Sequence, residues 1–290
     1  MTPARLLLRA SAPPRATHPG PRVRNAAPRF QEALISLARR RLLPTNAGTA
    51  EIAQWSRAIR DTSVFSARVV QEEFLAEIQR VVATVIAPVQ TTRPDRITPE
   101  NPSGTVEIGA NYADARLKLR ETLDRLQYRP ATEDAGTIKD LSSQRRLDTI
   151  LEVQTRKAQA FAQDVQANDP DTIDLYPAFE FYRQEDRKER RAWGTIWNYA
   201  RTQVGETSAN LVEPAADSGM YALVNDPIWG ALGDAAESFG GGGIDGDTPP
   251  YAFGSGMWRR EVDRATAIRL GLPVQNVRAI QKPLTLEAAA

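Results

Sequence analysis

Apolar residues recur every three or four positions through most of the chain before residue 169. That spacing gathers them on one face of a helix, which is the face that a protein core buries. It predicts helices over residues 30–43, 48–59, 66–87, 111–128 and 142–168. A proline follows the first, third, fourth and fifth of these ranges and ends each helix, because proline lacks the backbone N–H that the next turn requires.

The third and fifth helices carry the longest apolar stripes, and we assign both stripes to core packing. The stripe of the third helix is Val70, Phe74, Ile78, Val81, Val82 and Val85. The stripe of the fifth is Leu147, Ile150, Leu151, Gln154, Ala158, Phe161 and Val165, with Arg145, Arg146, Arg156 and Lys157 on the outside. Ser142 or Ser143 is placed to cap the fifth helix, and Asn111 the fourth, because such side chains accept hydrogen bonds from free backbone N–H groups.

The pattern changes at two places. Residues 88–109 are rich in Pro, Thr and Gly and show no periodicity, which predicts a loop or linker. After residue 169 the elements shorten, and Leu175–Arg183 has the alternating aromatic pattern of a strand. We predict a short helix around Trp193 and Trp197, a short strand over 220–224, a short helix over 226–232, and a last helix that Asp263 caps.

These elements predict an α+β fold with a predominantly helical N-terminal half and a smaller mixed α/β C-terminal part. The predicted division is a disordered basic leader over residues 1–27, a helical domain over 28–168, a small α+β domain over 169–274 and a C-terminal arm over 275–290. The arm carries a spaced apolar pattern that suits an added strand or a contact with a neighbour.

Composition excludes several classes of chemistry. The 290 residues include no cysteine, which excludes disulfides and thiolate catalysis, and a single histidine, His18, which argues against a zinc site or a histidine-based triad. The net charge of +1 gives no global attraction to nucleic acid or membrane. No apolar run approaches the roughly 18 residues that span a bilayer, so we expect no membrane partner.

Arginines gather at two places near the N-terminus. Residues 1–27, including Arg22 and Arg24, contain no acid, which is typical of a disordered leader, of an arm that lies on nucleic acid or a partner, or of a targeting signal. Arg39, Arg40 and Arg41 close the first helix, where cations complement the helix dipole. They are also candidates for contact with phosphates or with an acidic partner.

No group of residues carries a convincing catalytic signal. Asp245 and Asp247 could hold a hard cation, but four glycines precede them where a buried strand would be needed, so a turn is the simpler interpretation. The glycine run also lacks the Lys-Ser/Thr ending of a phosphate-binding loop. We therefore expect no catalytic residues, no bound metal and no cofactor, and basic helix ends and long loops indicate an assembly protein.

Several stretches, taken in order, resemble the Mu-F-like phage head morphogenesis family, also called minor head proteins. They are Val64–Arg68, Tyr112–Arg120, Ile138–Ser143, Arg146–Ile150, Tyr176–Arg183, Asp186–Arg187, Arg191–Trp193, Asn225–Leu232, Pro249–Met257, Val262–Arg264 and Ala267–Leu272. No single stretch is a sharp signature, and the specificity lies in their order and spacing.

The resemblance implies a structural component of the virion, present in few copies at the portal vertex and capsid interior, with host cytoplasm as its location during assembly. It implies portal protein and capsid subunits as partners. Under it, the basic leader and Arg39–Arg41 become candidate contacts with packaged DNA or portal, and such phosphate contacts would be salt-sensitive and sequence-blind. A non-sequence-specific nucleic-acid-binding module is the alternative, followed by a metal-dependent hydrolase that uses Asp245 and Asp247.

Overall fold

The computed structural model describes residues 31–87, 89–92, 97–99, 102, 105–108, 112–187, 190–211, 218–244 and 246–276. The helices are α1 (Gln31–Arg39), α2 (Thr49–Ala53), α3 (Arg57–Thr62), α4 (Glu72–Ile86), α5 (Tyr112–Arg125), α6 (Gln144–Ala167), α7 (Pro170–Leu175), α8 (Trp193–Gln203), α9 (Ile228–Ser238) and α10 (Arg264–Arg269), and a 3-10 turn covers Val274–Asn276. The strands are β1 (Arg41–Leu42), β2 (Ser63–Val64), β3 (Val89–Thr92), β4 (Thr105–Ile108), β5 (Ala178–Arg183), β6 (Asn210–Leu211), β7 (Met220–Leu223) and β8 (Met257–Val262). The predicted α+β class, with a helical N-terminal half, is confirmed.

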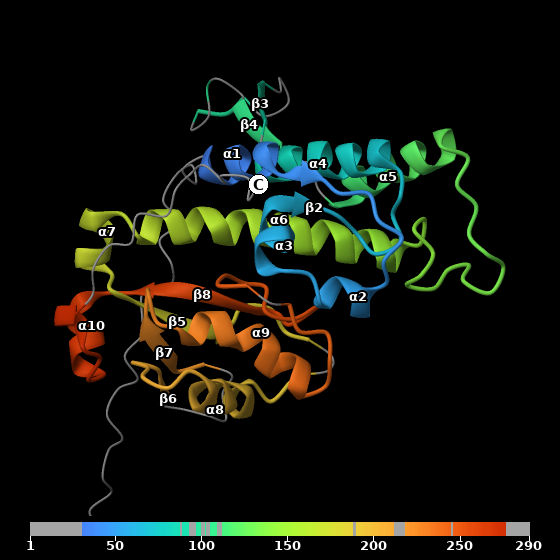
Figure 1. Cartoon of the computed structure of the whole chain (residues 1–290). Helices are drawn as coiled ribbons and strands as arrows, with labels where there is room; N and C mark the ends of the chain where they lie inside the picture. Colours follow the sequence, from blue (N-terminus) through green and yellow to red (C-terminus); the bar gives the residue numbers. More distant parts are fainter. Residues whose placement is uncertain are drawn as a thin grey trace, which may run out of the picture.

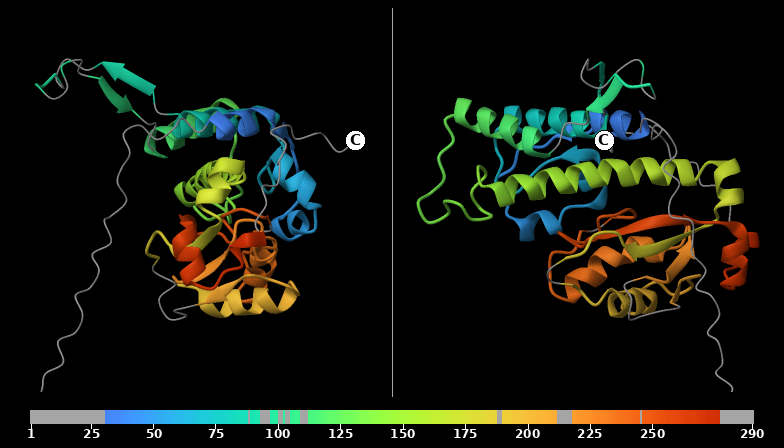
Figure 2. Two further views of the ribbon diagram at one scale, coloured as in Figure 1. Left: turned by 90° about the vertical axis from the view of Figure 1, so that its left-hand side faces the viewer. Right: turned by 180° about the vertical axis from the view of Figure 1, so that it is seen from behind.

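The elements are arranged in layers about α6 (Figures 1 and 2). Helices α1, α4 and α5 lie on one side of it and contact it. On the other side lies a four-stranded sheet of order β6-β7-β5-β8, with α8 and α9 beyond the sheet. Because α6 touches both sides, its side chains decide how the helical layer and the sheet are held together.

Helix α6 contributes to two hydrophobic clusters, with Ala162 in the first and Ala167 in the second. The first joins α1, α4, α5 and α6 through side chains such as Leu37, Phe74 and Leu151. The second lies beneath the sheet and is rich in aromatic rings. In its centre the ring of Phe181 lies 5.1 Å from that of Trp193 and 5.6 Å from that of Tyr251, measured between centroids. Edge-to-face contacts of this kind stabilise a core beyond the area that they bury.

The outer edge of the sheet is covered by α6. All pairings in this sheet are antiparallel, and β8 is its last strand. Two α6 side chains donate to backbone carbonyls of β8: Gln163 Nε2 to Arg259 O at 3.2 Å, and Arg156 Nη1 to Met257 O at 3.5 Å. An open strand edge can pair with another chain, and here side chains of a helix occupy it instead.

A buried ion pair fastens the same two elements. Arg259 Nη2 lies 3.3 Å from Asp164 Oδ1 on α6, and both side chains are almost fully excluded from solvent. The guanidinium carbon of Arg259 lies 4.4 Å from the ring centre of Phe179 and 5.2 Å from that of Trp229. The charge of Arg259 is therefore compensated by one carboxylate and two aromatic faces inside the core.

Several predicted helix ends are confirmed. The Ser143 side chain accepts from Arg146 N at the start of α6, and that of Asp263 accepts from Thr266 N at the start of α10. The predicted burial of one face of α6 is confirmed at Leu147, Ile150, Leu151, Gln154 and Ala158. Phe161 and Val165, predicted on the same face, are half-buried. The predicted cap Asn111 lies outside the described residues.

Other predictions were wrong in detail. Residues 88–109, predicted as a loop, contain the antiparallel pair β3 and β4. The predicted strand over 175–183 begins only at Ala178, because Pro170–Leu175 forms α7. The sequence pattern did not predict strand β8. It also predicted one helix over residues 48–59, whereas the structure has two, α2 and α3, and Ser56 caps the start of α3.

Burial was also mispredicted at Val70 and at Arg156. Helix α4 begins at Glu72, so Val70 is 54% exposed and its neighbour Val69 is buried instead. Arg156, predicted on the outside of α6, is buried. It forms an ion pair with Glu185, and its guanidinium carbon lies 5.7 Å from the ring centre of Trp258, so the charge is compensated within the fold.

Candidate functional site

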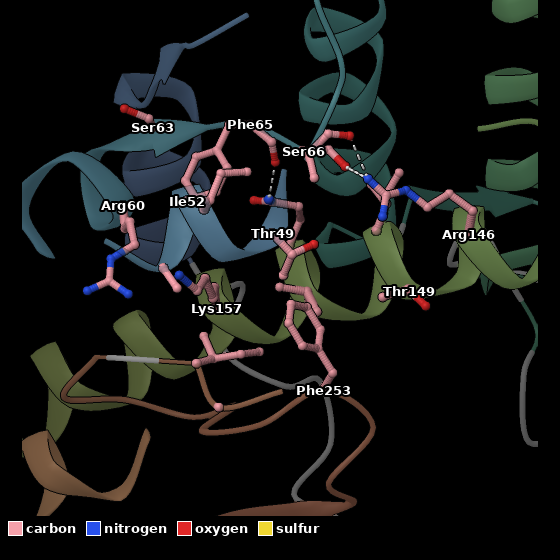
Figure 3. Close-up of a pocket in the computed structure, with 17 residues that line it drawn as sticks. Thr49, Ile52, Arg60, Ser63, Phe65, Ser66, Arg146, Thr149, Lys157 and Phe253 are labelled. Atoms are coloured by element: carbon pink, nitrogen blue, oxygen red, sulfur yellow. Dashed lines mark hydrogen bonds between the residues drawn. The ribbon is translucent and has the colours of Figure 1, made fainter. Parts of the chain in front are cut away.

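An apolar cavity of about 130 Å³ lies where α2, β2, α6 and the segment before β8 come together (Figure 3). Its apolar walls include Ile52, Phe65, Ile150, Val153, Ile244 and Phe253. A cavity with such walls suits an apolar group of the size of one side chain.

Side chains of α6 fix one wall of this cavity. Arg146 Nη2 donates to Ser66 Oγ at 2.7 Å and to Ala67 O at 2.9 Å, and Gln154 Nε2 donates to Phe65 O at 3.3 Å (Figure 3). Burial lowers the pKa of the Arg146 guanidinium, with a smaller opposing effect from Tyr128. The segment that follows β2 is therefore held against α6 by three hydrogen bonds from two residues.

Charged residues stand at the rim of the cavity. Arg60 and Lys157 belong to its lining, and Lys157 Nζ lies 4.0 Å from Asp61 Oδ1. The lining therefore combines cationic side chains with apolar walls, and the carboxylate of Asp61, which pairs with Lys157, is not part of it.

A wider cleft of about 1140 Å³ lies beside the cavity along the first half of α6. It shares Thr49, Arg146, Thr149, Val153 and Phe253 with the cavity, so the two hollows are adjacent. Its charged lining consists of four arginines and two acids: Arg120, Arg145, Arg146, Arg187, Asp148 and Glu152.

The two acids of the cleft are engaged by arginines. Arg116 Nη1 lies 2.5 Å from Asp148 Oδ1, and Arg187 Nη2 lies 2.7 Å from Glu152 Oε1. Arg120 donates from Nε to a backbone carbonyl, Ser142 O, at 3.3 Å. Within the part of the chain that the structure describes, neither Arg120 nor Arg145 forms an ion pair, and both are exposed. The cleft thus offers two arginines to an anion.

The loop before α6 forms one wall of the cleft and is organised by Asp140. This buried carboxylate accepts from Gly136 N and Ser142 N, both at 2.8 Å, and from Ser142 Oγ at 2.7 Å. Burial alone raises the pKa of Asp140, but the hydrogen bonds from Ser142 and Gly136 outweigh it and the net pKa is lowered. Asp140 is therefore charged at neutral pH and holds Gly136, a residue with φ of +72°, at the cleft.

Of the predicted contact residues near the N-terminus, the described ones, Arg39, Arg40 and Arg41, do not line either hollow. Arg22 and Arg24 lie outside the described residues. Arg39 and Arg41 are exposed at the junction of α1 and β1. Arg40 is 6% exposed, so its side chain is not presented on the surface of this chain. Burial lowers its pKa to about 10, and Asp61 opposes that shift.

The sequence placed Arg145 on the outside of its helix but marked neither Arg120 nor Arg145 as a contact residue. A signal was present, since the first turn of α6 contains no acid and begins Gln-Arg-Arg. Helix N-termini ordinarily favour acidic residues, because their free N–H groups carry partial positive charge. Two arginines at that end of a helix concentrate positive potential there.

Of the two acids named for the hydrolase alternative, Asp245 and Asp247, the structure describes only Asp247. Asp245 lies outside the described residues, and Asp247 uses its backbone carbonyl to accept from Arg259 Nη1 at 3.2 Å. Among the described residues, no group of three or more His, Asp or Glu side chains could hold a metal ion. In the same residues, no helix has the length and apolar character needed to cross a membrane.

Comparison of the chain with protein-family models, with curated proteins and with solved structures finds no match.

Proposed function

We propose that this chain is a structural minor head protein of a phage or of a prophage-derived particle. In this role it associates with the portal vertex and the capsid interior and aids head assembly and the packaging or ejection of DNA. Its partners would be portal protein and capsid subunits, with possible contact to packaged DNA through the basic N-terminal region. It would be found in the virion, and in host cytoplasm during assembly.

The proposal rests on the resemblance of ordered segments to the Mu-F-like head morphogenesis family. One observation carries it further: segments of that set that are distant in sequence lie against one another. Arg146 holds Ser66 and Ala67 by hydrogen bonds. Phe181 packs edge-to-face on both Trp229 and Tyr251. Contacts between resembling segments that are distant in sequence support a shared fold more strongly than scattered short matches would.

The features of the candidate site are also consistent with assembly. An exposed pair of arginines beside an apolar cavity can bind another chain, and the site groups no set of residues that would act as nucleophile and base. In the proposed role the protein binds other head components and catalyses no reaction.

Deletion of the coding sequence from the element that encodes it tests this role. We expect fewer DNA-filled heads, or heads that fail to eject DNA, counted by electron microscopy and by quantitative PCR of protected genomes. Complementation with the wild-type chain should restore them. Unchanged numbers of filled, infective particles would contradict the proposal.

A further inference from the structure

The cavity and the neighbouring cleft have complementary properties. The cavity is apolar and has room for one side chain, since an engineered apolar cavity of about 150 Å³ in another protein holds benzene. The cleft is larger than the roughly 300–1,000 Å³ of sites for small ligands, which suits an extended segment better than a compact molecule. Their shared lining places the apolar hollow directly beside the cationic one.

Exposed apolar groups mark the same place. Ile138 is 38% exposed and Phe253 is 37% exposed, and both line the cleft. Large apolar side chains rimmed by charged ones are characteristic of surfaces that bind other proteins. A partner that covered these two side chains would gain from removing them from water.

The charges define the chemistry of the partner. Arg120 and Arg145 have no carboxylate partner among the described residues, so anionic groups opposite them would be favoured. Arg146 lines both hollows, but it already donates hydrogen bonds to Ser66 and Ala67. We therefore assign it to holding the cavity wall and not to binding the partner. Arginine recognises carboxylates with two parallel hydrogen bonds, which also fixes the orientation of the ligand.

The apolar cavity favours a peptide over nucleic acid. Nucleic acid presents phosphates and polar base edges, and it has no aliphatic side chain to fill a cavity lined by Ile52, Phe65 and Ile150. A peptide can place its carboxylates opposite Arg120 and Arg145 and keep neutral residues opposite the two acids of the cleft. It also supplies the apolar side chain for which the cavity is shaped.

We infer that the cavity and cleft together bind an acidic segment of a partner protein, with one apolar side chain in the cavity and carboxylates at Arg120 and Arg145. This inference deepens the proposed assembly role and rests on it, because it names the chemistry of the segment through which a head component would be held. The interaction is salt-sensitive, since both arginines are exposed.

Fluorescence anisotropy with a labelled probe peptide, Ser-Glu-Asp-Leu-Phe-Asp-Glu-Ser, tests it on the full chain at low ionic strength. Two matched probes isolate the two contributions: one replaces the acids by Asn and Gln, and one replaces Leu and Phe by Ser. We expect the parent probe to bind. The probe without acids should bind about fivefold more weakly, roughly the upper effect of an exposed ion pair. The probe without Leu and Phe should bind at least fivefold more weakly, because no apolar side chain then fills the cavity.

Variants of the chain locate the binding. Arg120→Glu and Arg145→Glu should each weaken the parent probe by about fivefold or more, and Arg145→Lys should retain most of the binding. Ile138→Ser should weaken the parent probe but leave the Ser-substituted probe unchanged. Arg269→Glu on α10, outside the cleft, is the control and should change nothing. Circular dichroism checks that each variant is folded.

Three results would overturn the inference. The parent probe could fail to bind, it could bind equally to Arg145→Glu and to the wild type, or a random-sequence DNA duplex could bind more tightly and be lost in the same variants. The last result would assign the cleft to nucleic acid. Failure of the probe while the chain is still found in particles removes this inference and leaves the assembly role intact.

Discussion

Removal of the Asp164 carboxylate should destabilise the chain far more than removal of a similar carboxylate on the surface. In Asp164→Ala the guanidinium of Arg259 stays buried without its anionic partner, which lay 3.3 Å away. Breaking a buried pair in this way costs about 3–5 kcal/mol. We expect about 3 kcal/mol, the lower end, because Arg259 keeps its hydrogen bond to Asp247 O and its contacts with Phe179 and Trp229.

The assay is urea unfolding at neutral pH, followed by tryptophan fluorescence and circular dichroism. Asp148→Ala is the matched control on the same helix, since its pair with Arg116 is partly exposed and its loss should cost about 1 kcal/mol or less. The double variant Asp164→Leu with Arg259→Met should recover most of the lost stability, because neither charge of this pair then remains in the core. If Asp164→Ala costs no more than Asp148→Ala, the buried pair does not hold α6 to β8 as argued.

Three further predictions follow from buried polar groups. Arg40→Met should leave the free energy of unfolding unchanged or raise it by about 1 kcal/mol, because burial disfavours the charge and buried donors of Arg40 lack partners; a clear loss in urea unfolding would refute this. Asp140→Asn should lower the free energy of unfolding, with the full cost at pH 7. The cost should shrink as the pH falls below 3.8, the ordinary pKa of an aspartate, because Asp140 stabilises the fold only while it is charged. Urea unfolding measured from pH 7 down to pH 3 checks this, and a cost that does not change with pH would contradict it. Asp226→Ala removes acceptors for Thr207, Ser208 and Ile228, so it should cost about 2–4 kcal/mol and speed proteolytic cleavage near Ser208, whereas cleavage at the wild-type rate would count against it.

Helical periodicity could be read from the sequence wherever a helix buries one face. The stripe of α6 follows from it as far as Ala158, and Ser143 and Asp263 follow from capping chemistry. Val70 shows where prediction from periodicity fails. It fits the period of Phe74 and Ile78, but Arg68 has φ of +59° and Val69 pairs with Thr45, so the helix starts later and the buried valine changes by one position.

Strand β8 and the buried charges could not be read from the sequence because their partners are remote. Met257–Val262 carries Arg259, Arg260 and Glu261 in its middle, which argues against a buried strand when the sequence is read alone. Arg260 is neutralised by Glu180 from β5, with Arg260 Nε donating to Glu180 Oε2 at 2.7 Å. Arg259 is neutralised by Asp164, 95 residues away. Only the folded arrangement supplies these partners.

The cleft was missed for a related reason. Arg120 and Arg145 belong to different helices, α5 and α6, and neither is unusual among the surface arginines of the chain. Their significance arises because the neighbouring acids are paired with other arginines, which is a property of the arrangement. The absence of an acid from the first turn of α6 was the one local sign.

Quantitative proteomics of purified particles tests the proposed assembly role most directly. Mature heads and empty precursors from the source should be compared, together with particles from a strain that lacks the portal protein. The account predicts a few copies of the chain per particle and reduced recovery when portal is absent. Complete absence of the chain from both kinds of particle would contradict it.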